Sequence, residues 1–208
     1  MKPKLLIAFL SLAIFSCTQT KEEKAFKIFN EGVTLSLNAA EEAAKGDEVK
    51  ATETNNLAIE KFRETLKIDS SHLLAKSALA HSLYWGKKFE DAIHWYNIAI
   101  HGDSAMAVLY QERGLCKINL GRVTEGKKDI YKAFELDPSN EIKALTVEDL
   151  YDIGKLAYEY GAGYEKEGKK EIGLTYKKFA IEVLALSAEI APARKDISES
   201  IKTFSNEL

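Results

Sequence analysis

Three features are scarce in this 208-residue chain: cysteine, clustered positive charge and long apolar runs. Two cysteines cannot make a disulfide framework, so stability must come from packing. The formal net charge is −3 and no segment concentrates lysine and arginine, so the chain lacks the surface that displaces counterions from phosphates. We therefore exclude nucleic acid as a partner. After residue 17 no long apolar segment follows, yet hydrophobic residues make up 46% of the chain, enough for one continuous core.

The first 17 residues have the composition of a targeting segment. Lys2 and Lys4 supply positive charge, and residues 5–15 form an uncharged apolar run that ends just before a cysteine. A helix of that length extends only about 16 Å, whereas the core of a bilayer is about 30 Å thick. The segment therefore indicates a signal peptide and not a permanent membrane span.

That cysteine, Cys17, follows a serine and resembles the lipobox cysteine of bacterial lipoproteins. The resemblance implies that residues 1–16 are a signal peptide, that Cys17 is lipidated, and that residues 17–24 tether the folded part to a membrane of the cell envelope. Thr18 in place of an aspartate favours the outer membrane, facing the periplasm. Phe15 departs from the pattern, which has a small residue there. The alternative is an ordinary secretory signal in which Cys17 is incidental.

The chain contains an internal repeat with a period of 34 residues. Shifting the sequence by one period keeps size and polarity at most matched positions. In the first shift Ala58, Phe62, Leu66 and Asp69 fall on Ala92, Tyr96, Ile100 and Asp103. In the second shift Tyr96, Ala99, Ile100 and Asp103 fall on Ile130, Ala133, Phe134 and Asp137. A repeat of this length indicates a stack of similar structural units.

Within each repeat the apolar residues follow helical spacing. Between residues 89 and 100 they recur at intervals of three and four, which places them on one face of a helix. Gly86 and Gly121 stand where first helices should end, and Gly102 and Asp137 where second helices should close. No stretch alternates with period two for long enough to be a convincing strand, so the fold class is all-α.

These residues resemble the tetratricopeptide repeat (TPR), in which two antiparallel helices carry a set pattern of aromatic and small residues. The clearest copy, residues 107–140, matches that pattern at Tyr110, Gly114, Gly121, Ala133 and Asp137-Pro138. A second copy, residues 73–106, keeps Leu79, Ala80, Leu83, Phe89, Ala92, Tyr96 and Ala99. Lys117 and Gly126 depart from the pattern. The resemblance implies a right-handed solenoid of antiparallel helix pairs.

The flanking units are less regular. Residues 26–44 and 55–67 are expected to form a first helix pair joined by a long connection over residues 45–54, and a fourth pair is expected from about residue 150 to residue 190. A short closing helix completes a TPR-like domain over residues 25–208, with about four units. Terminal units are often atypical because one face meets solvent. A three-layer helical bundle is the competing architecture.

The resemblance also implies a concave groove lined by the first helices, which in this family usually holds a peptide. Helical spacing places nine side chains on that face, three from each of three units. They are Ser77, His81, Tyr84, Gln111, Leu115, Ile118, Tyr151, Lys155 and Tyr158. Some TPR proteins hold a terminal carboxylate with basic side chains, but the corresponding positions include Ser77 and Glu112, so that clamp is missing.

No catalytic, metal or cofactor site is expected. The four histidines form no HExxH pair, and His81 is better explained as a hydrogen-bonded structural residue than as a ligand. Cys116 has no activating neighbour in sequence, which favours a small buried side chain, and a lipidated Cys17 would leave it without a disulfide partner. The glycines between residues 161 and 173 lack the preceding strand of a phosphate loop, and indicate close helix packing instead.

The sequence thus predicts a lipid-anchored scaffold or adaptor that binds a protein or peptide partner in its groove. The alternative is a solute-binding accessory protein, in which a small apolar ligand occupies a pocket walled by the tyrosines of the fourth unit. Those are Tyr151, Tyr158, Tyr160, Tyr164 and Tyr176. An enzyme is a third and weaker reading, which would require carboxylates or histidines brought together by the fold.

Overall fold

The computed structural model describes residues 20–208, and in that range the chain forms nine α-helices and no strand. Their bounds are α1 Lys21–Ala44, α2 Glu48–Ile68, α3 Leu73–Trp85, α4 Phe89–Gly102, α5 Ala107–Asn119, α6 Val123–Leu136, α7 Asn140–Lys166, α8 Lys170–Ile190 and α9 Lys195–Ser205. Within this part of the chain no helix is both long and apolar enough to cross a membrane. The expected signal peptide and Cys17 lie outside the described residues.

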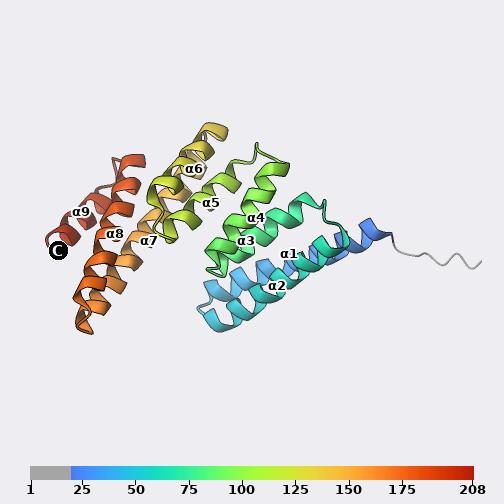
Figure 1. Cartoon of the computed structure of the whole chain (residues 1–208), viewed down its shortest axis with the longest axis horizontal. Coiled ribbons are helices and arrows are strands. Elements are labelled where there is room, and N and C mark those ends of the chain that lie inside the picture. The colour runs from blue at the N-terminus through green and yellow to red at the C-terminus, as the bar shows by residue number, and fades with distance from the viewer. Residues whose placement is uncertain (1–19) are drawn as a thin grey trace, which may run out of the picture.

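The first eight helices form four antiparallel pairs that stack side by side, and α9 packs against α8 at the end of the stack (Figure 1). Each pair contacts mainly the next one, as expected for a solenoid, because α2 packs on α3 and α4 packs on α5. The predicted all-α, TPR-like solenoid of four units with a closing helix is therefore confirmed.

Local signals at the helix ends explain most of the observed bounds. Gly86 is the C-cap of α3, and Gly121, with φ of +77°, makes the turn after α5 in a conformation that favours glycine. Asp137 directly follows α6. The glycine and aspartate positions singled out in the sequence are therefore the points where helices end.

Two expectations about the N-terminal region were wrong, and both missed a helix start. The first pair has no long connection, because the Asp47 side chain accepts a hydrogen bond from the Lys50 backbone N–H and α2 begins at Glu48. Residues 21–24, expected in the tether, form the first turn of α1. There Thr20 and Glu23 make a reciprocal capping box, with bonds of 3.0 and 3.1 Å.

The core runs along the stack of helix pairs, and in it small side chains pack against large ones. Phe62, Leu79, Leu83 and Tyr96 are fully buried in the first half, together with alanines such as Ala92. Burying one such large side chain contributes about 1.5–3 kcal/mol. In the second half, buried residues of α7 and α8 cover the core face of α5, so the last pair completes the core of the third.

Two pairs of glycines let neighbouring helices touch backbone to backbone. A Cβ built on Gly126 of α6 would lie 2.5 Å from the Gly114 carbonyl oxygen of α5. A Cβ on Gly173 of α8 would lie 2.7 Å from the Gly161 carbonyl oxygen of α7. Gly126, which departs from the TPR pattern, therefore serves close packing, and the same packing explains two of the glycines between residues 161 and 173.

Lys117, the other departure, belongs to an ion-pair cluster between α5 and α6. Asp129 accepts two hydrogen bonds from the Arg113 guanidinium, at 2.7 and 2.6 Å, and lies 2.8 Å from the Lys117 Nζ. All three side chains are at most 16% exposed. One carboxylate is therefore shared by two largely buried cations, and the cluster joins the two helices of the third pair.

Candidate binding groove

A row of three adjoining cavities runs along one face of the solenoid, from the first helix pair to the last. The first is about 260 Å³ and is lined by residues of α1, α2 and α3, including Leu37, His81 and Trp85. The second, about 290 Å³, shares Trp85 with the first and reaches Asp149 and Ile153 of α7. We call this row the inner groove.

The third cavity of the inner groove, about 240 Å³, shares Lys87, Phe89, Asn119 and Ile153 with the second. Its remaining wall comes from α7 and α8 and consists of Leu156, Ala157, Tyr160, Tyr176 and Phe179. Because each cavity shares side chains with the next, a chain lying in the groove would contact all four helix pairs.

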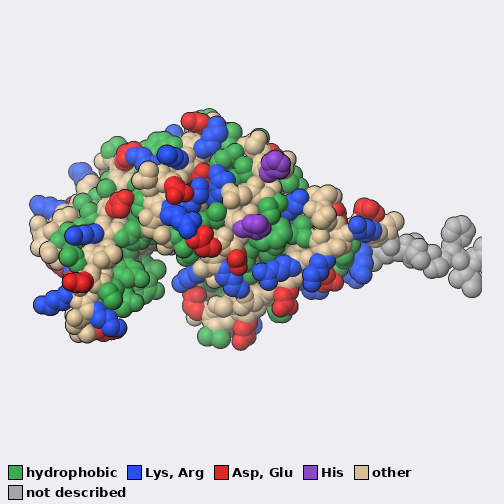
Figure 2. Space-filling view, in the orientation of Figure 1, with side chains coloured by type: hydrophobic (Ala, Val, Ile, Leu, Met, Phe, Trp, Pro, Cys, Tyr) green, Lys and Arg blue, Asp and Glu red, His purple; other side chains and the backbone are tan. Residues whose placement is uncertain are grey.

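Large apolar side chains are exposed along the inner groove, at both ends and where the first two cavities meet. Leu37 is 67% exposed, Trp85 50% and Tyr160 51%. The space-filling view shows the molecule hollowed between the α1–α2 end and the α7–α8 end, with apolar side chains on the α7–α8 wall (Figure 2). Exposed apolar groups gathered in one hollow mark an interaction site more often than single ones scattered over a surface.

Glu112 of α5 organises the polar floor between the repeats. Its carboxylate accepts a hydrogen bond from the Tyr96 hydroxyl at 2.7 Å and lies 2.6 Å from the His81 Nδ1. Burial lowers the pKa of His81, but the hydrogen bond and the charge of Glu112 raise it by more, so that its pKa lies above the usual value. Both oxygens of Glu112 thus have partners within the protein.

Asp149 of α7 lines the second cavity and is held differently. Its one hydrogen bond comes from the Gln111 side-chain amide at a long 3.4 Å, and it has no ion pair among the described residues. Burial, followed by the negative charges of Glu112, Asp152 and Glu148, raises the pKa of Asp149 to about 6. The inner groove therefore contains one carboxylate that lacks a cationic partner.

The sequence placed six groove residues on α3 and α5, and the structure brings two of them to the inner groove. His81 lines the first cavity and Tyr84 the second. Ser77 is half-buried, and its hydroxyl donates to the Leu74 backbone oxygen at 3.0 Å. It lines none of the three cavities.

The three predicted positions on α5 are buried, so their assignment to a groove surface was wrong. Leu115 and Ile118 are 1% and 0% exposed and pack against α7 and α8. Gln111 is 6% exposed, although its amide reaches Asp149. The cause is the close stacking of the fourth pair on the third, which covers this face of α5.

None of the three predicted positions on α7 lines the inner groove, and two of them, Tyr151 and Tyr158, face the closing helix. Tyr158 stacks on Phe204 of α9 with ring centroids 3.6 Å apart. The Tyr151 hydroxyl lies 3.3 Å from the Ser200 Oγ, and the Lys155 ammonium lies 5.4 Å from the Tyr151 ring centroid. The groove face of α7 is instead formed by Asp149 and residues further along the same face.

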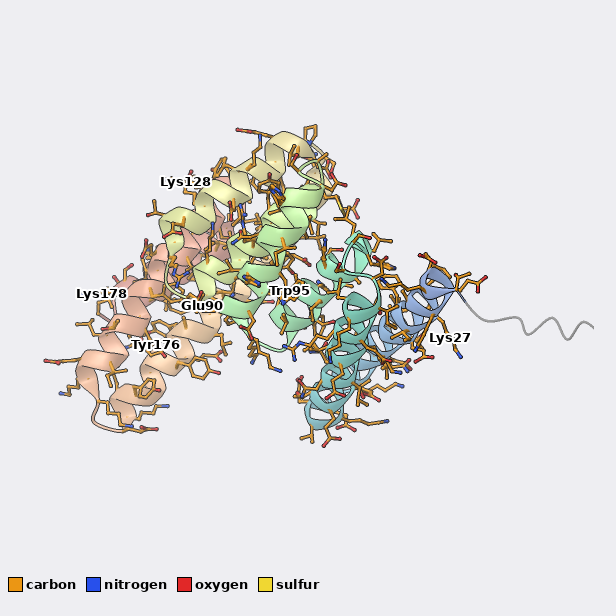
Figure 3. All side chains as sticks on the ribbon, turned by 45° about the vertical axis from the view of Figure 1, so that its right-hand side comes forward. Lys27, Glu90, Trp95, Lys128, Tyr176 and Lys178 are labelled. Carbon is orange, nitrogen blue, oxygen red and sulfur yellow. The ribbon has the colours of Figure 1, made fainter. Side chains whose placement is uncertain are left out.

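The five tyrosines of the fourth unit do not share one pocket. Tyr160 and Tyr176 line the third cavity, and Tyr164 stacks on Tyr176 with ring centroids 5.4 Å apart. Tyr176 lies on α8, two residues before Lys178 (Figure 3). Tyr151 and Tyr158 are covered by α9. The third cavity, about 240 Å³, is also smaller than the roughly 300–1,000 Å³ of typical small-molecule sites.

Metal binding and thiol chemistry are the other possibilities for residues 20–208. No three histidine, cysteine or acidic side chains there are placed to hold a metal ion. Cys116 is fully buried, and burial followed by the charge of Glu112 raises the pKa of its thiol. A protonated, inaccessible thiol is a poor nucleophile, so the predicted packing role of Cys116 is confirmed.

Comparison with known proteins gives short or distant likenesses. No protein-family model matches the chain. Over 53 residues it is 42% identical to the Hsp70-Hsp90 organizing protein of Triticum aestivum, a match that covers 26% of this chain and 9% of that protein. Among solved structures, MamA is similar with a TM-score of 0.42 and 18% identity, over 81% of this chain and 87% of that one. A TPR repeats protein from Bacteroides fragilis has a TM-score of 0.43 and 16% identity, over 92% of this chain and 100% of that one.

Proposed function

We propose that this protein is a scaffold that binds a segment of a partner protein in its inner groove. The observation that supports this most directly is the continuity of the three cavities across all four helix pairs. A small solute would fill one cavity, whereas a row of shallow, adjoining cavities suits an extended segment with a side chain in each. Catalysis is not part of the proposal, since the groove combines apolar walls with a single unpaired carboxylate.

The test is photocrosslinking in the native cell from a photoreactive residue placed at Trp85, where the first two cavities meet. Its matched control is the same residue at Val49, which is 72% exposed on α2 and lines none of the three cavities. A discrete protein crosslinked from position 85 and absent from position 49 is the expected result. Equal crosslinking from both positions, or none from either, would count against a binding function for the inner groove.

The second part of the proposal concerns location: a lipid on Cys17 anchors the scaffold in the cell envelope, at the outer membrane facing the periplasm. Its support is the order of positive charge, short apolar run and Cys17 in the sequence. Stable anchoring needs more than one acyl chain, as bacterial lipoproteins carry. The N-cap of α1, Thr20, comes three residues after Cys17, which leaves little chain between the lipid and the fold.

Membrane fractionation of Cys17→Ser tests the anchor without disturbing the groove. We expect the variant to leave the membrane fraction or to accumulate as an unprocessed precursor. Cys116→Ser is the control, because it removes the other cysteine and should fractionate as the wild type does. If Cys17→Ser is processed and retained as fully as the control, the protein is not a lipoprotein.

A further inference from the structure

The second cavity of the inner groove has the chemistry of a receptor for a positively charged side chain. Its walls include three aromatic rings, those of Tyr84, Trp85 and Phe89, and its floor includes the Asp149 carboxylate. Aromatic faces attract ammonium and guanidinium groups, and a carboxylate supplies the opposite charge. Few other side chains interact favourably with both the aromatic rings and the carboxylate. Asp149 would repel an acidic side chain, and an aliphatic side chain would bury Asp149 without a partner for its charge.

Within residues 20–208 the protein supplies Asp149 with a long hydrogen bond from Gln111 but with no cationic partner. The neighbouring Glu112 is fully engaged by Tyr96 and His81, so neither of those groups compensates Asp149. Lys87 lines the same cavity but makes no ion pair with Asp149. The carboxylates of Glu112, Asp152 and Glu148 add negative charge around Asp149. A cation from outside would relieve this repulsion.

We infer that the partner segment carries a lysine or arginine that enters the second cavity, next to apolar side chains that occupy the first and third. This inference rests on the proposed function and adds the chemistry of the partner. It follows from charge complementarity, since the carboxylate lies at the middle of a groove whose ends expose Leu37 and Tyr160. An acidic tail is disfavoured, because it would meet the Asp149 carboxylate, which has no cationic partner in the described part of the chain.

The experiment is selection of a random peptide library on the full chain, followed by affinity measurement of the enriched peptides. We expect enrichment of a basic residue beside aromatic or aliphatic residues. A hydrogen bond to a charged group is worth about 1.5–3 kcal/mol, so Asp149→Asn should weaken binding of a selected peptide by about ten- to a hundredfold. Replacing the basic residue of the peptide by norleucine or glutamine should have a similar effect on the wild type and little effect on Asp149→Asn.

Asp152→Asn is the matched control, because it removes the same charge from an exposed position on α7 that does not line the second cavity. It should bind the selected peptide within about twofold of the wild type, as expected for an exposed charge. Trp85→Ala tests whether binding uses the groove at all, and it should weaken every selected peptide.

The outcomes separate the two proposals. Two results would overturn this inference and leave the proposed function standing. In the first, binding of the enriched peptides depends on Trp85 but the peptides show no enrichment of basic residues. In the second, the peptides bind Asp149→Asn as tightly as they bind the wild type. If Trp85→Ala weakens the binding of no enriched peptide, both the inference and the proposed function are contradicted. Loss of binding in Asp152→Asn equal to that in Asp149→Asn would indicate attraction by the overall charge of α7 and would also overturn the inference.

Discussion

Replacing Gly126 by alanine tests the backbone contact between α5 and α6. The added Cβ would lie 2.5 Å from both the Gly114 carbonyl oxygen and the Ile118 Cγ1, whereas ordinary contact begins at 3.4 Å. The two helices would therefore have to separate by almost 1 Å, and a carbonyl oxygen cannot move aside by changing rotamer. Overpacking of this kind costs about 1–3 kcal/mol.

Alanine also favours helix over glycine by about 1 kcal/mol, which partly offsets the steric cost. Gly163→Ala removes this ambiguity, because Gly163 lies in α7 and a Cβ there would meet nothing within 4 Å. The two variants share the gain in helix propensity, so the difference between their free energies of unfolding is the steric cost, about 1–3 kcal/mol. Gly163→Ala should be more stable than the wild type, and Gly126→Ala should not.

Thermal unfolding followed by circular dichroism at 222 nm measures this difference. For a domain of this size 1 kcal/mol changes Tm by about 2–4 °C, so Tm of Gly126→Ala should lie about 2–12 °C below that of Gly163→Ala. Equal stabilisation by both substitutions would refute the backbone contact, and with it the explanation for the departure of Gly126 from the repeat pattern.

Three further predictions follow from the cluster at Asp129, the carboxylate of Asp149 and the thiol of Cys116. Asp129→Ala leaves Arg113 and Lys117 unpaired and should lower the free energy of unfolding by about 3–5 kcal/mol in urea titrations, whereas a loss below about 1 kcal/mol would mean that water already screens the cluster. The pKa of Asp149 is raised from 3.8 to about 6, so the folded state binds this proton more tightly than the unfolded chain does. The stability of the wild type relative to Asp149→Asn should therefore fall by roughly 2–3 kcal/mol as the pH rises from about 4 through 6, and a pH-independent difference would contradict that pKa. A thiol reagent should label Cys116 in Cys17→Ser only in denaturant, and rapid labelling of the folded variant would show that α5 is not packed as described.

The repeat architecture could be predicted because its signals are local. The period of 34 residues, the helical spacing of apolar residues and the glycines at helix ends each act within one unit or between adjacent units. The capping residues Thr20 and Asp47 carried equally local information, and the two wrong boundaries came from leaving them out.

The groove could be predicted only in part because its surface depends on how the units stack. Leu115 and Ile118 occupy groove positions in the repeat pattern, but the side chains of α7 and α8 cover them. Tyr158 meets α9 instead of a partner. Asp149 was missed altogether, because an acidic residue in a helix usually faces solvent, and only the approach of α3 and α5 makes it part of a cavity.

The most direct test of the central claim uses the two tryptophans of the chain as reporters. Trp85 borders the first two cavities of the inner groove, while Trp95 lies on α4 and lines none of the three. A synthetic peptide copied from the crosslinked segment of the partner would be titrated into Trp95→Phe, in which only Trp85 emits, and into Trp85→Phe. Binding in the inner groove predicts a saturable blue shift of emission in Trp95→Phe and none in Trp85→Phe; saturable binding without a change in the emission of Trp85 would show that the partner binds elsewhere.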